Sequence, residues 1–379
     1  MSVLIAVDKF KGSLTQVEVS QVVEQALINK GLDSKVIVIA DGGDGSIMAL
    51  EKIGWQLLKV GVTGPVDQQH IAKYAVSPDG KKVALEVAEL CGIKLLEGGL
   101  APFQASSHAL GEAIIKIKPS EYEELLIFIG GSASVDGGVG ALSALGVGLY
   151  DAKGLKISPN LSGLMRLKAI NSKQLAQIQQ NIFQNCKITV LSDTNYRLLG
   201  FKGAAMAFGK QKGLGWIDRI RAELALRRFA RLISRFNHGK PERTPGSAGA
   251  GGIGFAFHSF FAASIESGSN YFYKETDFVN ELKDASLLIT GEGRIDETTT
   301  SGKSIYPLLT AARASQIKCL MICGSADAHT VKRLKKEFPT IVDILQLKDT
   351  GLPIKVLMKD AAELLRRELD KIPIERWIK

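Results

Sequence analysis

The run Val3-Leu-Ile-Ala-Val7, followed by a helical pattern from Thr15 to Asn29 and a second apolar run at Lys35–Ala40, indicates how this chain folds. Short β-rich runs that alternate with helical periodicity are typical of β-α-β units. The same alternation returns near the C-terminus. There the apolar runs are Ser286–Thr290, Lys318–Cys323 and Ile341–Gln346. Five strands of this kind can form one doubly wound parallel sheet.

The middle of the chain, roughly 60–280, has a different pattern. Extended runs are followed by a glycine-rich turn at Gly130 and a long basic helix after Gly215; the runs are Leu57–Val62, Ile71–Val76 and Lys82–Ala88. This pattern indicates a mixed α/β domain inserted into the first one. We therefore predict an α/β protein of two domains. Residues 1–60 and 281–379 form the doubly wound parallel-sheet domain, and residues 61–280 form the inserted domain.

Composition excludes several classes of protein. The 379 residues are 45% hydrophobic and 23% charged, which is ordinary for globular domains and unlike disordered, collagenous or coiled-coil chains. The first apolar run is too short for a signal peptide. Four cysteines without paired CxxC spacing indicate a reduced, cytoplasmic protein without structural zinc. The uncharged stretch at 244–265 opens with glycines and a proline, so we expect a buried loop and helix there and no membrane span.

The positive charge is concentrated in one segment. The net charge is +9, and the window 210–243 holds ten basic and three acidic residues, which gives +7. A helix at Trp216–Phe236 would place its large apolar residues on one face and its arginines mostly elsewhere; the apolar residues are Ile217, Ile220, Leu224, Ile233 and Phe236. We expect this face to pack into the core and the basic face to be solvated, without nucleic acid as a partner. A non-catalytic protein that binds anions or nucleic acid through this helix is a rival hypothesis.

Charged and polar residues follow three of the predicted strands. These residues are Asp8, Lys11 and Ser13 after the first strand, Asp41 and Asp44 after the second, and Arg294 and Asp296 after a later one. Open α/β sheets bind ligands at the carboxyl ends of their strands. Lysine and arginine attract anions there, while carboxylates can hold magnesium. Any single cluster is more often a turn with a surface charge, but three in one sheet favour a site.

Two glycine-rich segments have an ambiguous meaning. Gly130–Gly140 follows an apolar run, and it is either a phosphate-binding loop or a close-packed corner between a strand and a helix. Gly249–Gly254 matches G-x-G-x-x-G, but the segment before it contains two prolines and cannot be the strand that a dinucleotide site requires.

A third segment, Gly302-Lys303-Ser304, resembles the end of a P-loop. However, Glu297 occupies the position of the first glycine of that motif, so the sequence does not support a P-loop.

Taken together, several segments resemble those of the bacterial glycerate kinases of the glycerate 2-kinase type. The likeness covers nearly the whole chain in the family's order. The matching segments are Ala6–Leu14, Ala40–Ser46, Val62–Pro65, Gly130–Gly140, Phe208–Gly213, Pro245–Gly254 and Ile289–Asp296 with Gly302-Lys303. The resemblance implies a flavodoxin-like domain built from both chain ends. It also implies transfer of the γ-phosphoryl group of ATP to D-glycerate with Mg²⁺, most often giving 2-phosphoglycerate.

The resemblance and the strand-end pattern together suggest roles for individual residues. We expect Asp193, Asp296 and Lys11 to be catalytic. Substrate binding is assigned to Ser13, Arg294, Lys303 and Lys212, and magnesium binding to Asp8, Asp41 and Asp44. The nucleotide is expected at Gly130, Gly131, Ser132, Asp136, Gly249, Gly251, Gly252 and Gly254.

Three alternatives stay open at this point. Ser134-Val135 and Tyr196-Arg197 depart from the family pattern, which permits a kinase for another small hydroxy acid. The 3-phosphate is the alternative product. The oligomeric state is also undetermined, with a homodimer as one alternative.

Overall fold

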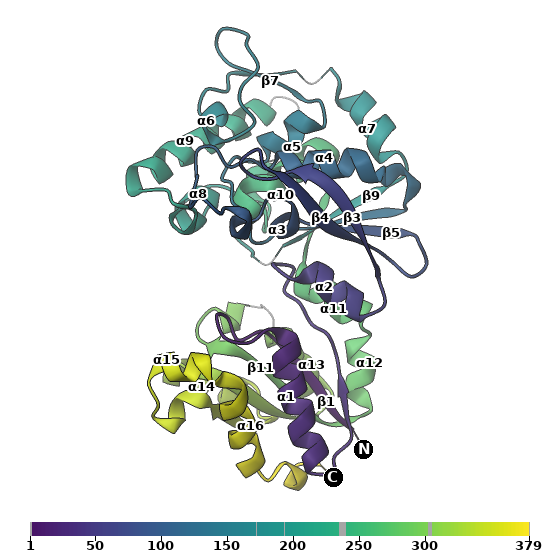
Figure 1. Cartoon of the computed structure of the whole chain (residues 1–379), viewed down its shortest axis with the longest axis vertical. Coiled ribbons are helices and arrows are strands. Elements are labelled where there is room, and N and C mark those ends of the chain that lie inside the picture. Colours follow the sequence, from purple (N-terminus) through teal and green to yellow (C-terminus); the bar gives the residue numbers. More distant parts are fainter. Residues whose placement is uncertain (1, 172, 193, 235–239, 302–304, 379) are drawn as a thin grey trace. The chain divides into compact units, whose positions relative to one another are not determined.

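The computed structural model describes residues 2–171, 173–192, 194–234, 240–301 and 305–378. The chain divides into two compact units, one formed by residues 1–40 and 269–379 and one by residues 41–268. We call them the terminal unit and the central unit (Figure 1). The sequence analysis placed the two domain boundaries between residues 60 and 61 and between residues 280 and 281. Residues 41–60 therefore lie in the central unit and residues 269–280 in the terminal unit, each opposite to the prediction.

The terminal unit contains the predicted five-stranded parallel sheet. Its strand order is β13-β12-β11-β1-β2, and every neighbouring pair is parallel. The strands are β1 (Ser2–Val7), β2 (Ser34–Val36), β11 (Ala285–Ile295), β12 (Lys318–Ala326) and β13 (Ile341–Gln346). The α/β fold class and the five strands are thus confirmed. The second strand is shorter than the predicted 35–40.

Helices cover both faces of this sheet because its inner strands, such as β1 and β12, are apolar on both sides. Val3, Ile5 and Val7 face one layer, whereas Leu4 and Ala6 face the other. The first layer contains α1 (Gln16–Asn29) and α16 (Ala361–Lys371), and the second contains α12 (Phe278–Lys283), α13 (Tyr306–Ala314) and α14 (Ala328–Glu337). Figure 1 shows α1 and α16 side by side. The other elements are η5 (Thr299–Ser301), η6 (Leu347–Thr350), α15 (Ile354–Lys359) and η7 (Ile374–Arg376).

Helix α1 begins where its sequence supplies a cap. Thr15 accepts a hydrogen bond from the Glu18 backbone N–H, and the Glu18 carboxylate accepts one from the Thr15 N–H at 2.7 Å. This capping box satisfies donors that an open helix end would leave unpaired. The predicted helix at 15–29 is therefore confirmed.

The central unit is built on a six-stranded mixed sheet of order β10-β9-β6-β5-β4-β3 and a small β7-β8 hairpin. The strands are β3 (Gln56–Thr63), β4 (Gln69–Val76), β5 (Lys82–Glu86), β6 (Glu124–Phe128), β7 (Gly148–Tyr150), β8 (Ala169–Asn171), β9 (Lys187–Ser192) and β10 (Ser264–Ser267). The first three pair antiparallel, and the pairs from β5 to β10 are parallel. The mixed α/β character predicted for the middle of the chain is confirmed.

The helices of the central unit other than α2 (Ser46–Lys52) share one continuous core with its sheet. They are α3 (Val87–Cys91), α4 (His108–Ile117), α5 (Val139–Ala144), α6 (Leu161–Leu164), α7 (Leu175–Phe183), α8 (Ala204–Phe208), α9 (Trp216–Ile233) and α10 (Gly249–Phe261). Short 3₁₀ turns are η1 (Ile93–Leu95), η2 (Pro119–Glu121), η3 (Lys210–Lys212) and η4 (Pro241–Arg243), and α11 (Gly268–Glu275) leads back into the terminal unit.

One helix packs differently from the prediction. The buried residues of α9 are Ala222, Glu223, Ala225, Leu226, Phe229, Ala230 and Ile233. Ile217, Ile220 and Leu224, which the sequence assigned to the core face, are exposed. Ile233 is buried as expected, and Phe236 lies outside the described residues. The buried side of the helix therefore combines three alanines with Leu226, Phe229 and Ile233.

Candidate active site

The predicted site residues divide between the two units. Asp8, Lys11, Ser13, Arg294 and Asp296 belong to the terminal unit. Asp193 and Lys303 lie outside the described residues. The remaining predicted residues belong to the central unit: Asp41, Asp44, Gly130, Gly131, Ser132, Asp136, Lys212, Gly249, Gly251, Gly252 and Gly254. Asp41 and Asp44 therefore belong to a different unit from Asp8, because the chain enters the central unit at residue 41.

In the terminal unit, the carboxyl ends of β1 and β11 bring charged residues to one edge of the sheet. Val7 pairs with Gly291, and the Asp8 N–H donates to the Gly291 carbonyl at 2.8 Å. A Cβ on Gly293 would lie 3.0 Å from the backbone nitrogen of Lys11, so glycine permits this close approach of the two backbone segments. As a result, Lys11 lies next to the strand segment that carries Arg294.

The turn after β1 holds itself in place through its backbone. The Phe10 N–H donates to the Leu14 carbonyl, and the Ser13 hydroxyl donates to the Phe10 carbonyl at 3.1 Å. Phe10 is buried in the sheet's core, whereas Lys11 is exposed. The buried ring therefore anchors a turn whose lysine reaches solvent.

Asp296 fixes the loop that follows β11. One of its carboxylate oxygens accepts from the Thr298 N–H at 2.9 Å and from the Thr298 hydroxyl at 2.6 Å. The other lies 3.5 Å from the Arg294 Nε, and the Arg294 side chain is 74% exposed. Arg294 is thus oriented at its base and open to an anion at its outer end, where its planar fork can grip a carboxylate or phosphate.

Glu292 belongs to this site, although the sequence did not single it out. The buried Thr299 hydroxyl donates to the Glu292 carboxylate at 2.6 Å and accepts from the Asp296 N–H at 3.0 Å. Glu292 therefore ties the loop of Asp296 back to the strand. A strand acid whose partner lies seven residues away has no local sequence signal, which explains why it was missed.

In the central unit, the loop Gly130–Gly140 folds around one buried carboxylate. Asp136 is fully buried and accepts hydrogen bonds from the backbone N–H groups of Ser107, Gly138 and Gly140 at 2.9, 3.0 and 3.2 Å. The hydroxyls of Ser107 and Ser134 also donate to it. We infer that Asp136 shapes the loop and that the prediction of direct nucleotide contact for this side chain needs revision.

Lys212 is bound to the same loop. Its ammonium group donates to the Ser132 hydroxyl and to the Ser134 carbonyl, both at 2.6 Å, and the residue is 4% exposed. This buried position differs from the open lysine that the predicted role in substrate binding requires. Among Gly130, Gly131 and Ser132, Gly131 is exposed and the other two are buried.

The second glycine-rich segment packs against the first. A Cβ on Gly251 would lie 2.2 Å from the Ser134 carbonyl oxygen, and one on Gly252 would lie 2.9 Å from the Gly137 α-carbon. Gly249 and Gly254 both face the Ile129 side chain, and all four glycines are buried. This geometry matches the close-packed corner that the sequence left open as an alternative to a phosphate-binding loop.

The segment Asp41–Ser46 is held by Glu86, a second acid that the sequence did not identify. The Glu86 carboxylate accepts from the backbone N–H groups of Gly45 and Ile47, each at 2.9 Å, and is buried. Burial raises the pKa of Glu86 to about 7, although these two hydrogen bonds act in the opposite direction. Asp41 accepts from the Gly43 N–H at 2.9 Å, and Asp44 forms an ion pair with Lys94.

The predicted magnesium ligands are Asp8 in the terminal unit and Asp41 and Asp44 in the central unit. Within the described ranges, no group of three or more His, Cys, Asp or Glu side chains is placed to hold a metal ion. A magnesium ion that arrives with nucleotide phosphates needs only one or two protein carboxylates. Asp8 stands at the end of β1 in the terminal unit, whereas Asp41 and Asp44 belong to the central unit.

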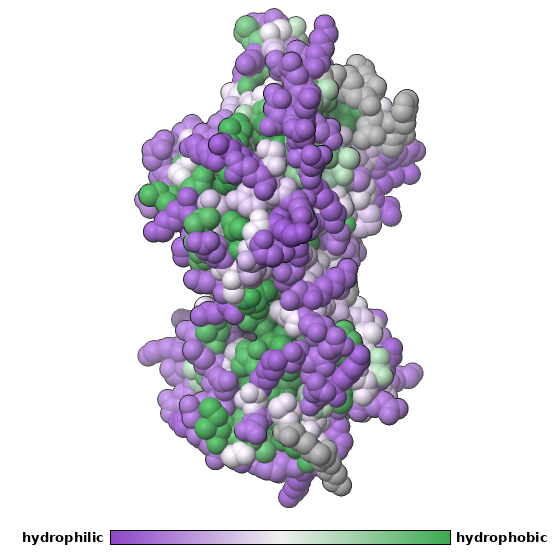
Figure 2. Space-filling view, turned by 90° about the vertical axis from the view of Figure 1, so that its right-hand side faces the viewer, coloured by the Kyte–Doolittle hydropathy of each residue, from purple (hydrophilic) through white to green (hydrophobic). Residues whose placement is uncertain are grey.

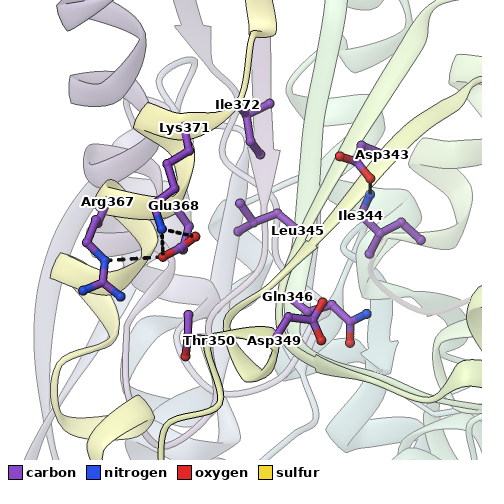
Figure 3. A pocket seen from close by; sticks show the side chains of 10 residues that line it. All are labelled: Asp343, Ile344, Leu345, Gln346, Asp349, Thr350, Arg367, Glu368, Lys371 and Ile372. Carbon is purple, nitrogen blue, oxygen red and sulfur yellow. Dashed lines mark hydrogen bonds and ion pairs between the residues drawn. The ribbon is translucent and has the colours of Figure 1, made fainter.

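Two cavities of the terminal unit are formed by other residues. The first, of about 410 Å³, lies between β13, η6 and α16 (Figure 3). Its charged residues partly neutralise one another, since Glu368 binds Lys371 at 2.8 Å and Arg367 at 3.3 Å. The second, of about 420 Å³, is an apolar groove along α13 beside Val279 of α12. Figure 2, which views the molecule from the side of α12, shows hydrophobic side chains gathered on this unit.

The fold and the terminal-unit site together define a class of protein: an α/β protein with cations and carboxylates at the carboxyl ends of adjacent parallel strands. Comparison with known proteins identifies the family. The profile of the glycerate kinase family matches residues 3–377. The chain belongs to the glycerate kinase family and is therefore a kinase by class. No helix within the described ranges combines the length and apolar character that crossing a membrane requires.

Individual relatives agree with this assignment. The chain is 31% identical to the glycerate 2-kinase of Escherichia coli K12 over 335 residues, which cover 86% of this chain and 85% of that one. It is 29% identical to a glycerate kinase of Bacillus subtilis over 97% of this chain and 95% of the relative. A crystal structure titled putative glycerate kinase 2 from Salmonella typhimurium LT2 superposes with a TM-score of 0.78 at 30% identity, covering 99% and 98% of the two chains.

Proposed function

We propose that this protein transfers the γ-phosphoryl group of ATP to D-glycerate and releases 2-phospho-D-glycerate and ADP. The observation that carries the proposal is the family match across residues 3–377, together with the Escherichia coli relative named glycerate 2-kinase. The terminal-unit site supports it, because Lys11 and Arg294 supply positive charge beside the carboxylates of Asp8 and Asp296. Phosphoryl transfer depends mainly on positioning and on neutralising charge, which such a set of side chains can provide.

The residues of the terminal unit divide this work. Arg294, held from one side by Asp296, binds the glycerate carboxylate or a phosphate through its guanidinium fork. Lys11 contributes a mobile point charge at the same edge of the sheet. Asp8 is our candidate to hold a magnesium ion, which would neutralise charge on the nucleotide phosphates. Asp296, and Asp193 by its sequence alone, are candidates to orient or deprotonate the acceptor hydroxyl.

Two further assignments concern the nucleotide contact, which we place in the central unit, and the cellular compartment, which we infer from the cysteines. The exposed backbone of Gly131 is our candidate for contact with a nucleotide phosphate, since the glycines around it are buried. The four free cysteines support action in a reducing compartment such as the cytoplasm.

The test is ADP release from magnesium-ATP with D-glycerate, measured in parallel with enolase alone, which consumes the 2-phosphate but not the 3-phosphate. ADP release together with an enolase signal is the expected result. Release without that signal would mean that the product is the 3-phosphate. If folded protein releases no ADP with glycerate but does so with another acid in a panel of small hydroxy acids, the proposed substrate is wrong.

A pair of variants tests the role of Arg294. Arg294→Lys keeps the charge and removes the planar fork, so kcat/KM should fall by roughly 10- to 100-fold. Arg333→Lys, on the exposed face of α14, is the matched control and should leave kcat/KM unchanged. Equal activity of the two variants would exclude Arg294 from substrate binding.

A further inference from the structure

Glu86 joins segments of the central unit that are far apart in the chain. It is the last residue of β5 and is 1% exposed. Its carboxylate accepts from the Gly45 and Ile47 N–H groups, each at 2.9 Å and each through a different oxygen. The Ser46 hydroxyl donates to the Gly43 carbonyl at 2.8 Å, which ties the preceding turn to the same helix end. A buried carboxylate therefore holds the start of α2 and the turn before it.

The turn that Glu86 holds lies against the loop after β6. A Cβ on Gly130 would lie 2.4 Å from the Gly43 α-carbon, and one on Gly131 would lie 3.7 Å from the Asp44 Cβ. Such distances leave no free space between the two backbones. The Asp44 carboxylate forms an ion pair with Lys94, so its charge beside the loop is balanced. A displacement of this turn would therefore be transmitted to the loop.

The helix that follows Glu86 contacts the same loop. A Cβ on Gly131 would lie 2.9 Å from the Ala88 Cβ of α3. The Ile93 N–H, just after that helix, donates to the Gly131 carbonyl at 2.9 Å. Glu86 thus connects two neighbours of Gly131, because its side chain holds the turn before α2 and its backbone leads into α3.

The choice of a carboxylate at this position has a cost that stability alone does not explain. Burying a charged side chain costs folding free energy, even where hydrogen bonds offset part of it. A glutamine of the same size would avoid the charge, but its amide N–H₂ would face one of the two backbone donors. Buried charges that a fold accommodates at such a cost are concentrated at functional sites.

We propose that Glu86 is a positioning residue for nucleotide binding, which holds residues 43–47 against the loop after β6 and thereby fixes the backbone of Gly131 for contact with a phosphate of MgATP. The inference rests on the proposed function, in which the exposed Gly131 contacts the nucleotide. Glu86 itself does not touch the nucleotide. Its contribution is preorganisation, because a bound phosphate does not have to order the loop.

The first test measures the binding of MgATP to the full chain by calorimetry without an acceptor, at pH 8, above the Glu86 pKa of about 7. Glu86→Gln keeps the size of the side chain but leaves one backbone N–H facing an amide N–H₂. It should raise the dissociation constant for MgATP by roughly 10-fold.

Glu124→Gln is the matched control for this measurement. The Glu124 carboxylate accepts from the Thr189 hydroxyl at 2.6 Å and pairs with Lys187 at 2.9 Å, and its side chain is 18% exposed. It stands at the start of β6, at the opposite end of the strand from Gly130. The dissociation constant of this variant should equal that of the wild type.

Steady-state kinetics separate positioning from a loss of folded protein. With D-glycerate as acceptor, Glu86→Gln should raise the KM for MgATP by about 10-fold and leave kcat within about two-fold of the wild type, because binding is weakened equally before and during transfer. A merely structural role would lower kcat through an inactive fraction of the protein and leave KM unchanged.

A measurement on the wild type does not depend on how the variant folds. MgATP should slow amide hydrogen exchange at 43–47 and at 130–133 by at least about 3-fold, because phosphate binding stabilises both segments. The β7–β8 hairpin is the internal control and should exchange at the same rate with and without the nucleotide.

Two results would overturn this inference alone. One is a Glu86→Gln variant that binds MgATP as tightly as the wild type, and the other is protection by MgATP that avoids both 43–47 and 130–133. A wild type that does not bind MgATP would refute the proposed function and the inference with it. Binding without transfer to glycerate would refute only the acceptor, and the calorimetric comparison would still test Glu86.

Discussion

Glu86 provides a direct test of how burial acts on a single carboxyl group. The group is buried, and its pKa of about 7 lies well above the ordinary glutamate value of 4.5 that applies to the unfolded chain. Between these two pH values the folded protein holds a proton that the unfolded chain has lost. The contribution of Glu86 to stability is therefore fully present below pH 4.5 and is lost as the pH rises through 7.

The size of the effect follows from the same two values. Their difference corresponds to about 3 kcal/mol of unfolding free energy. In Glu86→Gln the side chain stays neutral at every pH. We therefore expect the stability of the variant, relative to the wild type, to increase by about 3 kcal/mol between pH 4.5 and pH 8, with most of the change complete by pH 7.5.

Urea unfolding followed by tryptophan fluorescence measures this difference. A Trp377→Phe background restricts the signal to Trp55 and Trp216 of the central unit, which contains Glu86. Glu51→Gln, at an exposed position of α2, is the control and should show a constant difference from the wild type. A difference between Glu86→Gln and the wild type that varies by less than about 0.5 kcal/mol over this pH range would refute the reasoning.

Three further predictions concern the central unit and the thiols. Asp136→Asn turns an amide N–H₂ toward backbone donors and should lower the free energy of unfolding, measured by urea titration, by about 2–4 kcal/mol. The control is Asp151→Asn, in a more open turn, which should lower it by less than about 1 kcal/mol. Lys212→Met removes both hydrogen bonds to the loop and should speed amide hydrogen exchange at 131–140, followed by mass spectrometry, by at least about 10-fold. Lys210→Met, at an exposed position, is the control and should leave this exchange unchanged. Burial raises the pKa of Cys186 to about 11 and that of Cys323 to about 12, and it raises the pKa values of Cys91 and Cys319 further. A disulfide reagent at pH 8 should therefore label the thiols of the native protein slowly and all four thiols rapidly in urea. Rapid labelling of Cys91 or Cys319 in the native protein would contradict their burial.

The parallel sheet could be predicted because its signal is local. Strands buried on both faces read as short apolar runs, and the residues of β1 and β12 satisfy this pattern without reference to the rest of the chain. The second strand was predicted too long. Ile37 and Ile39 are buried, but pairing with β1 ends at Val36, so burial alone did not distinguish strand from coil.

Helix α9 shows where periodicity becomes ambiguous. Its sequence contains two apolar faces: one holds Ile217, Ile220 and Leu224, and the other holds three alanines with Leu226, Phe229 and Ile233. Hydrophobicity alone therefore does not decide which face is buried. The outcome depends on neighbouring elements such as α8, and those contacts are not encoded within the helix.

The two acids that the sequence missed share one physical cause. Glu86 binds the backbone around α2, which lies about forty residues away in the chain, and Glu292 binds a threonine on the far side of a loop. Neither contact produces a pattern of spacing. Asp296 and Arg294, in contrast, were found because they follow a recognisable strand within a few residues.

The glycines of the central unit help to position the loop at 130–140. A Cβ on Gly130 would lie 2.4 Å from the Gly43 α-carbon, and one on Gly252 would lie 2.9 Å from the Gly137 α-carbon. Segments far apart in sequence therefore touch through their backbones. The buried carboxylate of Asp136 then fixes the loop from inside. Gly131 is exposed at the edge of this rigid frame, so its backbone N–H is fixed in advance, and a bound anion would not have to order the loop.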